Sequence, residues 1–130
     1  MPAEAARLRE EWLGAIEALR EQVRGWAEAQ GWQVDQSERE VLEEQIGTYK
    51  VPVLEIDTPR GQVVLEPKGQ DLVGARGRVD LYAWPTLYRV MLLRKPGQDW
   101  VVRTESGLNW PHPWEQATFV ELAEGLLGAE

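Results

Sequence analysis

The hydrophobic residues of this chain follow two periods, a helical one between Ala3 and Gln30 and an alternating one from Tyr49 onward. In the first stretch they recur at steps of three or four, which places them on one face of a helix. These residues are Leu8, Trp12, Ile16, Leu19, Val23 and Trp26. The other faces are rich in Glu and Arg. We therefore expect the stripe to pack on the protein's own sheet, with pairing to a second copy of the helix as the alternative.

A second, shorter helix is predicted from Glu38 to Ile46. Ser37 and Glu40 have the spacing of a capping box, in which a hydroxyl and a carboxylate three residues later satisfy the first free amide groups of a helix. Gly47 would end this helix. Its inner face would carry Val41, Leu42 and Ile46.

Short hydrophobic segments separated by turn sequences predict five strands in the middle of the chain. They are Tyr49–Asp57, Gln62–Glu66, the two arms of a hairpin between Gly77 and Arg94, and Asp99–Thr104. Pro52 cannot donate to a strand ladder, which places the first strand at a sheet edge or near a bulge. Pro67 and Gly69 are expected to end the second strand, and Gln70–Arg76 is expected to be a loop.

A final helix is predicted from Pro113 to Gly128. Its inward stripe would consist of Phe119, Leu122, Ala123 and Leu126. Short connections favour antiparallel neighbours, so the fold class we predict is α+β: a long N-terminal helix, a short second helix, a five-stranded antiparallel meander and a C-terminal helix. We expect a single domain over 1–130, with a helical N-terminal part (1–47), an antiparallel sheet (48–105) and a C-terminal helix (113–128).

The hairpin between Gly77 and Arg94 can be assigned residue by residue. With Trp84–Leu87 as its turn, Ala83 lies opposite Tyr88, and two further pairs follow on the same face. These pairs are Leu81 with Val90 and Val79 with Leu92. The opposite face carries Asp80, Tyr82, Trp84, Leu87, Arg89, Met91 and Leu93, with Arg89 opposite Tyr82 and diagonal to Asp80.

The next turn, Lys95–Gln98, is expected to place Leu93 opposite Trp100 and Met91 opposite Val102. The second face of the sheet would then be more apolar than the helix stripes can cover. It would need a helix, a loop, a partner subunit or a ligand, because exposed apolar patches of this kind usually mark interfaces.

Composition narrows the classes of function. The formal net charge of −8 argues against nucleic acid as a partner, since phosphate binding depends on clustered Lys and Arg. The chain has no cysteine, which excludes a disulfide, a thiolate metal site and a thiol nucleophile. The charged N-terminal sequence MPAEAARLREEW lacks the apolar core of a secretory signal, and no run approaches membrane-spanning length. We therefore expect a soluble cytoplasmic protein with no membrane partner.

One short pattern has catalytic character. Asp57 precedes Glu66-Pro67-Lys68, and this arrangement is similar to the Asp…(Asp/Glu)-x-Lys signature of a family of Mg²⁺-dependent nucleases. The resemblance implies that Asp57 and Glu66 hold the metal and that Lys68 helps to position the attacking water. It covers twelve residues, and Pro67 interrupts the strand that should present them. We favour a solvated polar face of an outer hairpin over a nuclease site.

The sequence NWPHPW, from Asn109 to Trp114, holds the single histidine of the chain. Its two prolines keep the backbone extended, so Trp110, His112 and Trp114 stand at fixed positions with little entropy to lose on binding. Such rigid aromatics can form a stacking platform for a peptide, a sugar or a base. The alternative, which we favour, is that both tryptophans form a lid over the open sheet face and that His112 caps the last helix.

These observations favour a small non-catalytic binding protein. Its site would combine Tyr82, Trp84 and Arg89 with the Trp110–Trp114 segment, and its partner would be another protein or a second copy of the chain. This function requires no metal and no cofactor. The alternatives are the nuclease site and a small-molecule pocket between helix and sheet, lined by Trp84, Tyr82 and Arg89. We expect the pair of Asp80 and Arg89 to stabilise the sheet rather than to line a pocket.

Overall fold

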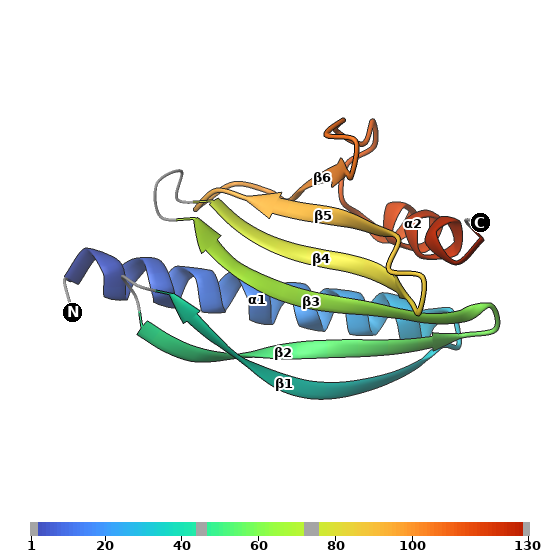
Figure 1. Ribbon diagram of the computed structural model, residues 1–130, viewed down its shortest axis with the longest axis horizontal. Coiled ribbons are helices and arrows are strands. Elements are labelled where there is room, and N and C mark those ends of the chain that lie inside the picture. Colours follow the sequence, from blue (N-terminus) through green and yellow to red (C-terminus); the bar gives the residue numbers. More distant parts are fainter. Residues whose placement is uncertain (1–2, 44–46, 72–75, 129–130) are drawn as a thin grey trace.

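The computed structural model describes residues 3–43, 47–71 and 76–128, which form two helices and a six-stranded antiparallel sheet. The elements in chain order are α1 (Ala3–Ala29), β1 (Gln33–Glu43), β2 (Gly47–Thr58), β3 (Gly61–Asp71), β4 (Arg76–Trp84), β5 (Arg89–Arg94), β6 (Val101–Thr104) and α2 (Gln116–Gly128). Each strand pairs with the next along the chain, so the sheet is a meander (Figure 1). The predicted α+β class is confirmed. Over the described residues, however, the sheet has six strands instead of five, and β1 replaces the predicted second helix.

Both helices cover the same face of the sheet. Figure 1 shows α1 behind the strands, with α2 near the end of α1. Four residues of the predicted α1 stripe are buried, Trp12, Ile16, Leu19 and Val23, while Leu8 and Trp26 are only half-buried. Helix α2 buries Phe119, Leu122 and Ala123 in the same core. The sheet contributes Ile56, Val63, Leu65, Val79, Leu81, Val90, Leu92 and Val102. Burial of one such aliphatic or aromatic side chain contributes roughly 1.5–3 kcal/mol, so this interface fixes the helices to the sheet. Neither α1 nor α2, the helices of the described residues, is long and apolar enough to cross a membrane.

The predicted helix from Glu38 to Ile46 is wrong where the structure describes it. Residues 33–43 instead pair with β2 in an unbroken antiparallel register that runs from Gln33 opposite Asp57 to Glu43 opposite Gly47. The backbone N–H and C=O groups of this segment therefore form hydrogen bonds with β2. In the predicted helix they would have bonded within the segment, with Ser37 and Glu40 capping its first turn. Val41 is buried as expected, but Leu42 is 78% exposed, and Ile46 lies outside the described residues.

The β2 strand changes direction near Pro52. It pairs with β1 along its whole length but with β3 only from Leu54 to Thr58, so Pro52 has a neighbouring strand on one side only. This agrees with the predicted edge position. Val51 and Leu54 belong to the same core although they are three residues apart, and side chains at that spacing point to opposite faces of a straight strand. The strand must therefore twist between them, and Figure 1 shows β1 and β2 crossing.

The twist brings the end of the first hairpin back against α1 and β3. The indole Nε1 of Trp12 donates to the hydroxyl of Tyr49 at 3.0 Å, and that hydroxyl donates to Oε2 of Glu43 at 2.9 Å. Burial and the nearby charge of Glu43 raise the pKa of Tyr49, so the phenol remains protonated at neutral pH. The hydrogen-bonded chain from α1 to β1 holds the twisted part of the hairpin in place.

The second strand of the prediction is longer than expected. The turn Thr58–Gly61 forms as proposed, but β3 continues past Pro67 to Asp71. Its register with β4 shifts between Pro67 and Gly69, which leaves Lys68 as the extra residue of a bulge. Proline and glycine thus bend this strand rather than end it, and 72–75 of the predicted loop lie outside the described residues.

The hairpin of β4 and β5 has the predicted register, with Leu81 opposite Val90, Val79 opposite Leu92 and Tyr82 opposite Arg89. The register of β5 with β6 was predicted wrongly by one residue. Leu93 lies opposite Val101 rather than Trp100, and Met91 lies opposite Arg103 rather than Val102. The turn at Lys95–Gln98 does form, with the amide of Gln98 donating to the carbonyl of Lys95 at 3.0 Å. Pairing resumes only after Trp100, and a shift of one residue moves every side chain to the other face.

Candidate functional site: the open face of the sheet

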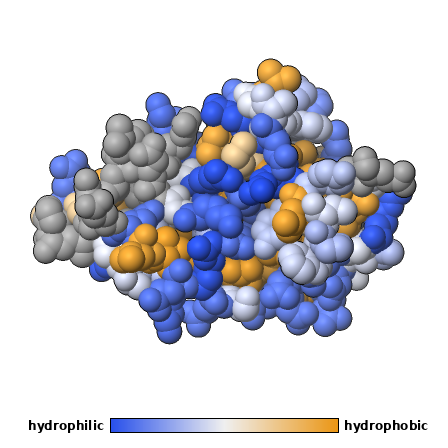
Figure 2. Space-filling model, viewed as in Figure 1, coloured by the Kyte–Doolittle hydropathy of each residue, from blue (hydrophilic) through white to orange (hydrophobic). Residues whose placement is uncertain are grey.

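No helix of the described residues covers the sheet face opposite α1 and α2, which we call the open face. Alternation along the strands places polar side chains on it, between inward residues such as Leu65, Leu81 and Val90. Its central residues are Glu66 and Lys68 of β3, Arg78, Asp80 and Tyr82 of β4, and Arg89 of β5. Figure 2 shows hydrophilic side chains gathered over the middle of this face, with hydrophobic ones beside them. The centre is therefore polar rather than apolar as the sequence suggested.

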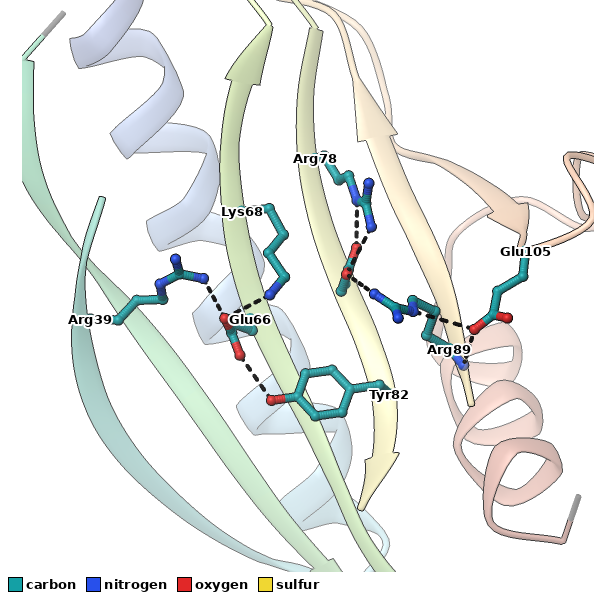
Figure 3. A network of polar contacts seen from close by, with 8 residues as sticks. Arg39, Glu66, Lys68, Arg78, Tyr82, Arg89 and Glu105 are labelled. Atoms are coloured by element: carbon teal, nitrogen blue, oxygen red, sulfur yellow. Dashed lines mark hydrogen bonds and ion pairs between the residues drawn. The ribbon is translucent and has the colours of Figure 1, made fainter. Parts of the chain in front are cut away.

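Asp80 is the most deeply buried charged group of this face, with 0% of its side chain exposed. Arg78 binds it with two parallel hydrogen bonds, Nε to Oδ1 at 2.8 Å and Nη2 to Oδ2 at 3.0 Å. Arg89 adds a contact of 3.3 Å from Nη1 to Oδ2 and also bonds Glu105 through Nε (Figure 3). The bonds to Asp80 raise the pKa of Arg78. Two guanidinium groups thus compensate a carboxylate that has lost its water.

Glu66 forms the second half of the network, directly opposite Asp80 on the neighbouring strand. It is bonded by Nη1 of Arg39, by Nζ of Lys68 at 2.9 Å and by the hydroxyl of Tyr82, which donates to Oε1 at 2.8 Å. Burial raises the pKa of Glu66, but the bonds from Lys68 and Tyr82 and the nearby positive charges outweigh it and lower the pKa overall. Burial together with the bond to Glu66 raises the pKa of Tyr82 to about 12.

The positive groups of the network lie above the negative ones. We call Arg39, Lys68, Arg78 and Arg89 the cationic cluster, and their side chains are between 35% and 42% exposed. The carboxylates beneath them are exposed by 16% in Glu66 and by 0% in Asp80. A molecule that approaches the open face therefore meets N–H groups first. This local surface contrasts with the net charge of −8 of the whole chain.

A pocket of about 170 Å³ lies over this network and is lined by Lys68, Asp80, Tyr82, Leu87 and Arg89. Leu87 belongs to the turn between β4 and β5 and has a φ of 67°, a left-handed conformation that costs a residue with a Cβ about 1–2 kcal/mol. Such strained residues cluster at functional sites. The pocket therefore combines two anchored cations, Lys68 and Arg89, with one apolar residue whose backbone is strained.

The sequence singled out Tyr82, Trp84 and Arg89 on this face. Tyr82 and Arg89 lie at the centre of the network, and the ion pair between Arg89 and Asp80 forms as expected. That pair does line a pocket, contrary to our preference. Trp84 is exposed at the end of β4 and does not line it.

Sequence reasoning missed two members of the cationic cluster. Arg78 lies two residues before Asp80 on the same strand, so alternation alone would have placed it on this face. Arg39 was assigned to a helix. It reaches Glu66 because the first hairpin twists toward β3, and no local pattern signals that approach.

The structure does not bring the residues of the nuclease pattern together. Asp57 lies opposite Gln62 and accepts a hydrogen bond of 3.1 Å from its Nε2. Glu66 follows Gln62 by four residues on the same strand, a separation of about 13 Å at the usual rise of a strand. Lys68 does pair with Glu66. Among the described residues, no group of three or more acidic or histidine side chains is arranged to hold a metal ion.

The Trp110–Trp114 segment lies on the helix side of the sheet, so the expected lid over the open face is wrong. Trp114 packs against Trp26 with ring centroids 5.4 Å apart and donates Nε1 to Oε1 of Gln22 at 2.9 Å. Trp110 packs against the same core and its amide donates to the carbonyl of Val102 at 2.8 Å. His112 is exposed between them, and the structure assigns it no capping bond.

Comparison of the chain with protein-family models, curated proteins and solved structures finds no match. Function must therefore be argued from the chemistry of the site itself.

The lowered pKa of Glu66 predicts how stability depends on pH. A carboxylate whose pKa is lower in the folded state stabilises the fold above its unfolded value of about 4.3, and this contribution is lost as pH falls through the folded value. We expect E66Q to lose less stability than the wild type between pH 6 and pH 3, measured by urea unfolding. E121Q removes an exposed carboxylate on α2 and serves as the control, with a loss close to that of the wild type. If the free energy of unfolding fell equally with pH in E66Q and the wild type, the lowered pKa of Glu66 in the folded state would be contradicted.

Proposed function

We propose that this protein is a non-catalytic binding protein that holds a small anionic ligand, through a carboxylate or phosphate group, on the open face of its sheet. The observation that carries the proposal is the layered arrangement of the site: a half-exposed cationic cluster above two carboxylates that are nearly or fully buried. Oxygen anions bind guanidinium and ammonium groups through strong charge-assisted hydrogen bonds, and Arg matches the geometry of both carboxylate and phosphate.

The arginines are held before a ligand arrives. Arg78 uses two of its five N–H groups on Asp80, and Arg89 is fixed between Asp80 and Glu105. Side chains that are already ordered lose little entropy on binding, so more of the interaction energy goes into affinity. The buried carboxylates therefore act as supports that aim the cations outward.

The chemistry of the pocket supports binding rather than catalysis. The described residues that line it include no serine, cysteine or histidine, and the hydroxyl among them, that of Tyr82, donates to Glu66. Since the pKa of Tyr82 is raised to about 12, this group is a hydrogen-bond donor at neutral pH and a poor general base. Leu87 offers one apolar wall, which suits a ligand with a short hydrocarbon part beside its anionic group.

A protein partner is the second candidate, and exposed hydrophobic residues beside the pocket favour it. Trp84, Leu87 and Tyr88 are all exposed large hydrophobic residues at the turn between β4 and β5. In that case the anionic group would be an acidic side chain of the partner, and the aromatic turn would supply the apolar contact.

Calorimetric titration with inorganic phosphate, acetate and succinate tests the proposal. We expect K68Q to weaken binding about tenfold, because it removes one cation of the pocket while Glu66 keeps Arg39 and Tyr82 as partners. K95Q makes the same change at an exposed turn and should bind like the wild type. Binding should also weaken as salt is raised. Equal affinities for K68Q and K95Q, or no heat with any of the three anions, would overturn the small-anion site and leave the protein partner as the candidate.

A further inference from the structure

A second pocket lies on the helix side of the sheet, between α1 and the segment that leads into α2. It has a volume of about 350 Å³, within the range of about 300–1,000 Å³ that is usual for ligand sites. Its lining includes Ala18 and Gln22 of α1, Arg94 and Asp99 near the turn after β5, and the two indoles of Trp100 and Trp114. None of these residues belongs to the cationic cluster, so the pocket is separate from the open face.

The aromatic walls of this pocket are fixed from behind. Trp100 packs against the buried Trp12 with ring centroids 6.0 Å apart, and Trp114 packs against Trp26 and Phe119 at 5.4 and 6.1 Å. On the α1 side, Ala18 is small and leaves room beside the indoles. The result is an apolar surface that keeps its shape without a ligand.

The polar groups of the pocket offer both donors and acceptors. Oε1 of Gln22 already accepts the bond from Nε1 of Trp114, so its amide NH₂ group is directed elsewhere as a donor. The positive charge of Arg94 is balanced by Glu11 at 2.8 Å, and Asp99 supplies an exposed carboxylate. The pocket therefore has no excess positive charge, in contrast to the open face.

We infer that this pocket binds a neutral polyhydroxylated ring, such as a monosaccharide unit. A pyranose has a face of C–H groups that packs on an indole and a rim of hydroxyl groups that donate and accept hydrogen bonds. Trp100 and Trp114 match the first, and Gln22, Arg94 and Asp99 match the second. An anion would meet the carboxylate of Asp99, while the charge of Arg94 is already balanced by Glu11. A purely apolar ligand would displace water from these polar groups without replacing its hydrogen bonds.

Saturation-transfer NMR with the methyl glycosides of glucose, galactose, mannose and N-acetylglucosamine tests the inference. We expect transfer from the wild-type protein to at least one of these sugars. In A18L the added side chain occupies the pocket, and the signal should fall at least fivefold. A29L places the same change at an exposed position at the end of α1 and should keep the signal. Circular dichroism on each variant confirms that the helix is intact.

Two further variants test whether sugar binding depends on this pocket and is independent of the open face. D99N changes one exposed oxygen to an amide nitrogen and should weaken sugar binding several-fold without affecting the fold. K68Q, which alters the open face, should leave sugar binding unchanged, so this site and the anion site can fail independently. Three outcomes would overturn the inference: no transfer to any of the sugars, equal transfer with A18L and A29L, or transfer to adenosine in place of the sugars.

Discussion

Replacement of Arg78 and Arg89 together by glutamine will destabilise the protein by about 3–5 kcal/mol, although both side chains are partly exposed. The cause is Asp80, whose carboxylate is fully buried and receives its ion pairs from these two residues. Without them a negative charge stays out of water with no compensating charge. Urea unfolding at pH 7 measures the loss.

Addition of D80N to the double variant should recover most of that stability, because no charge then remains to be buried. The matched control is R7Q combined with R60Q, which removes two arginines from exposed positions and should change stability by less than about 0.5 kcal/mol per site. If the control and the double variant are equally stable, Asp80 does not depend on its arginines and the layered account of the site fails.

G77A will destabilise the protein by about 1–3 kcal/mol through overpacking. A Cβ at Gly77 of β4 would stand 2.1 to 2.6 Å from three ring carbons of Trp12, well inside van der Waals contact. The indole has little room to move, since it is buried, bonded to Tyr49 and packed against Trp100. Thermal and urea unfolding should both show the loss.

At a second glycine, Gly14, substitution by alanine is expected to raise stability instead of lowering it. Gly14 lies exposed in α1 with no atom within 4 Å of an added Cβ, so G14A should stabilise the protein by about 0.5–1 kcal/mol.

A W12L background tests whether Trp12 causes the loss with G77A. Because the indole is absent there, the double variant W12L/G77A should be only slightly less stable than W12L alone. A loss with G77A that is unchanged in this background would show that the contact with Trp12 is not its cause.

The parts of the fold that the sequence predicted are those with a clear period. The α1 stripe has six hydrophobic residues at helical spacing, and the hairpin of β4 and β5 combines alternation with a proline turn that sets its register. The β1 strand lacks such a pattern, since Val41 is its one buried residue. With no alternation to detect, the capping pattern of Ser37 and Glu40 was the strongest local signal, and pairing with β2 overrode it.

The candidate site was predictable only in part for the same reason. Asp80, Tyr82 and Arg89 could be placed because the register of their hairpin was correct. Trp100 was placed on the wrong face because the length of one connection was misjudged by a residue. Arg39 reaches Glu66 only through the twist of β2 at Pro52, a tertiary event with no counterpart in residue spacing.

The partial pairing of β2 also divides the first hairpin into two units of different local stability. The part of β2 before Leu54 has no ladder partner in β3, so it can open together with its β1 partner while the meander from β3 to β6 stays intact. Contacts such as those of Tyr49 with Trp12 and of Arg39 with Glu66 hold it closed. Opening would remove Arg39 and leave more negative charge beneath the pocket. An anion bound on the open face will therefore favour the closed hairpin. Occupancy of the site is thus linked to the local opening of β1, the strand at the edge of the sheet.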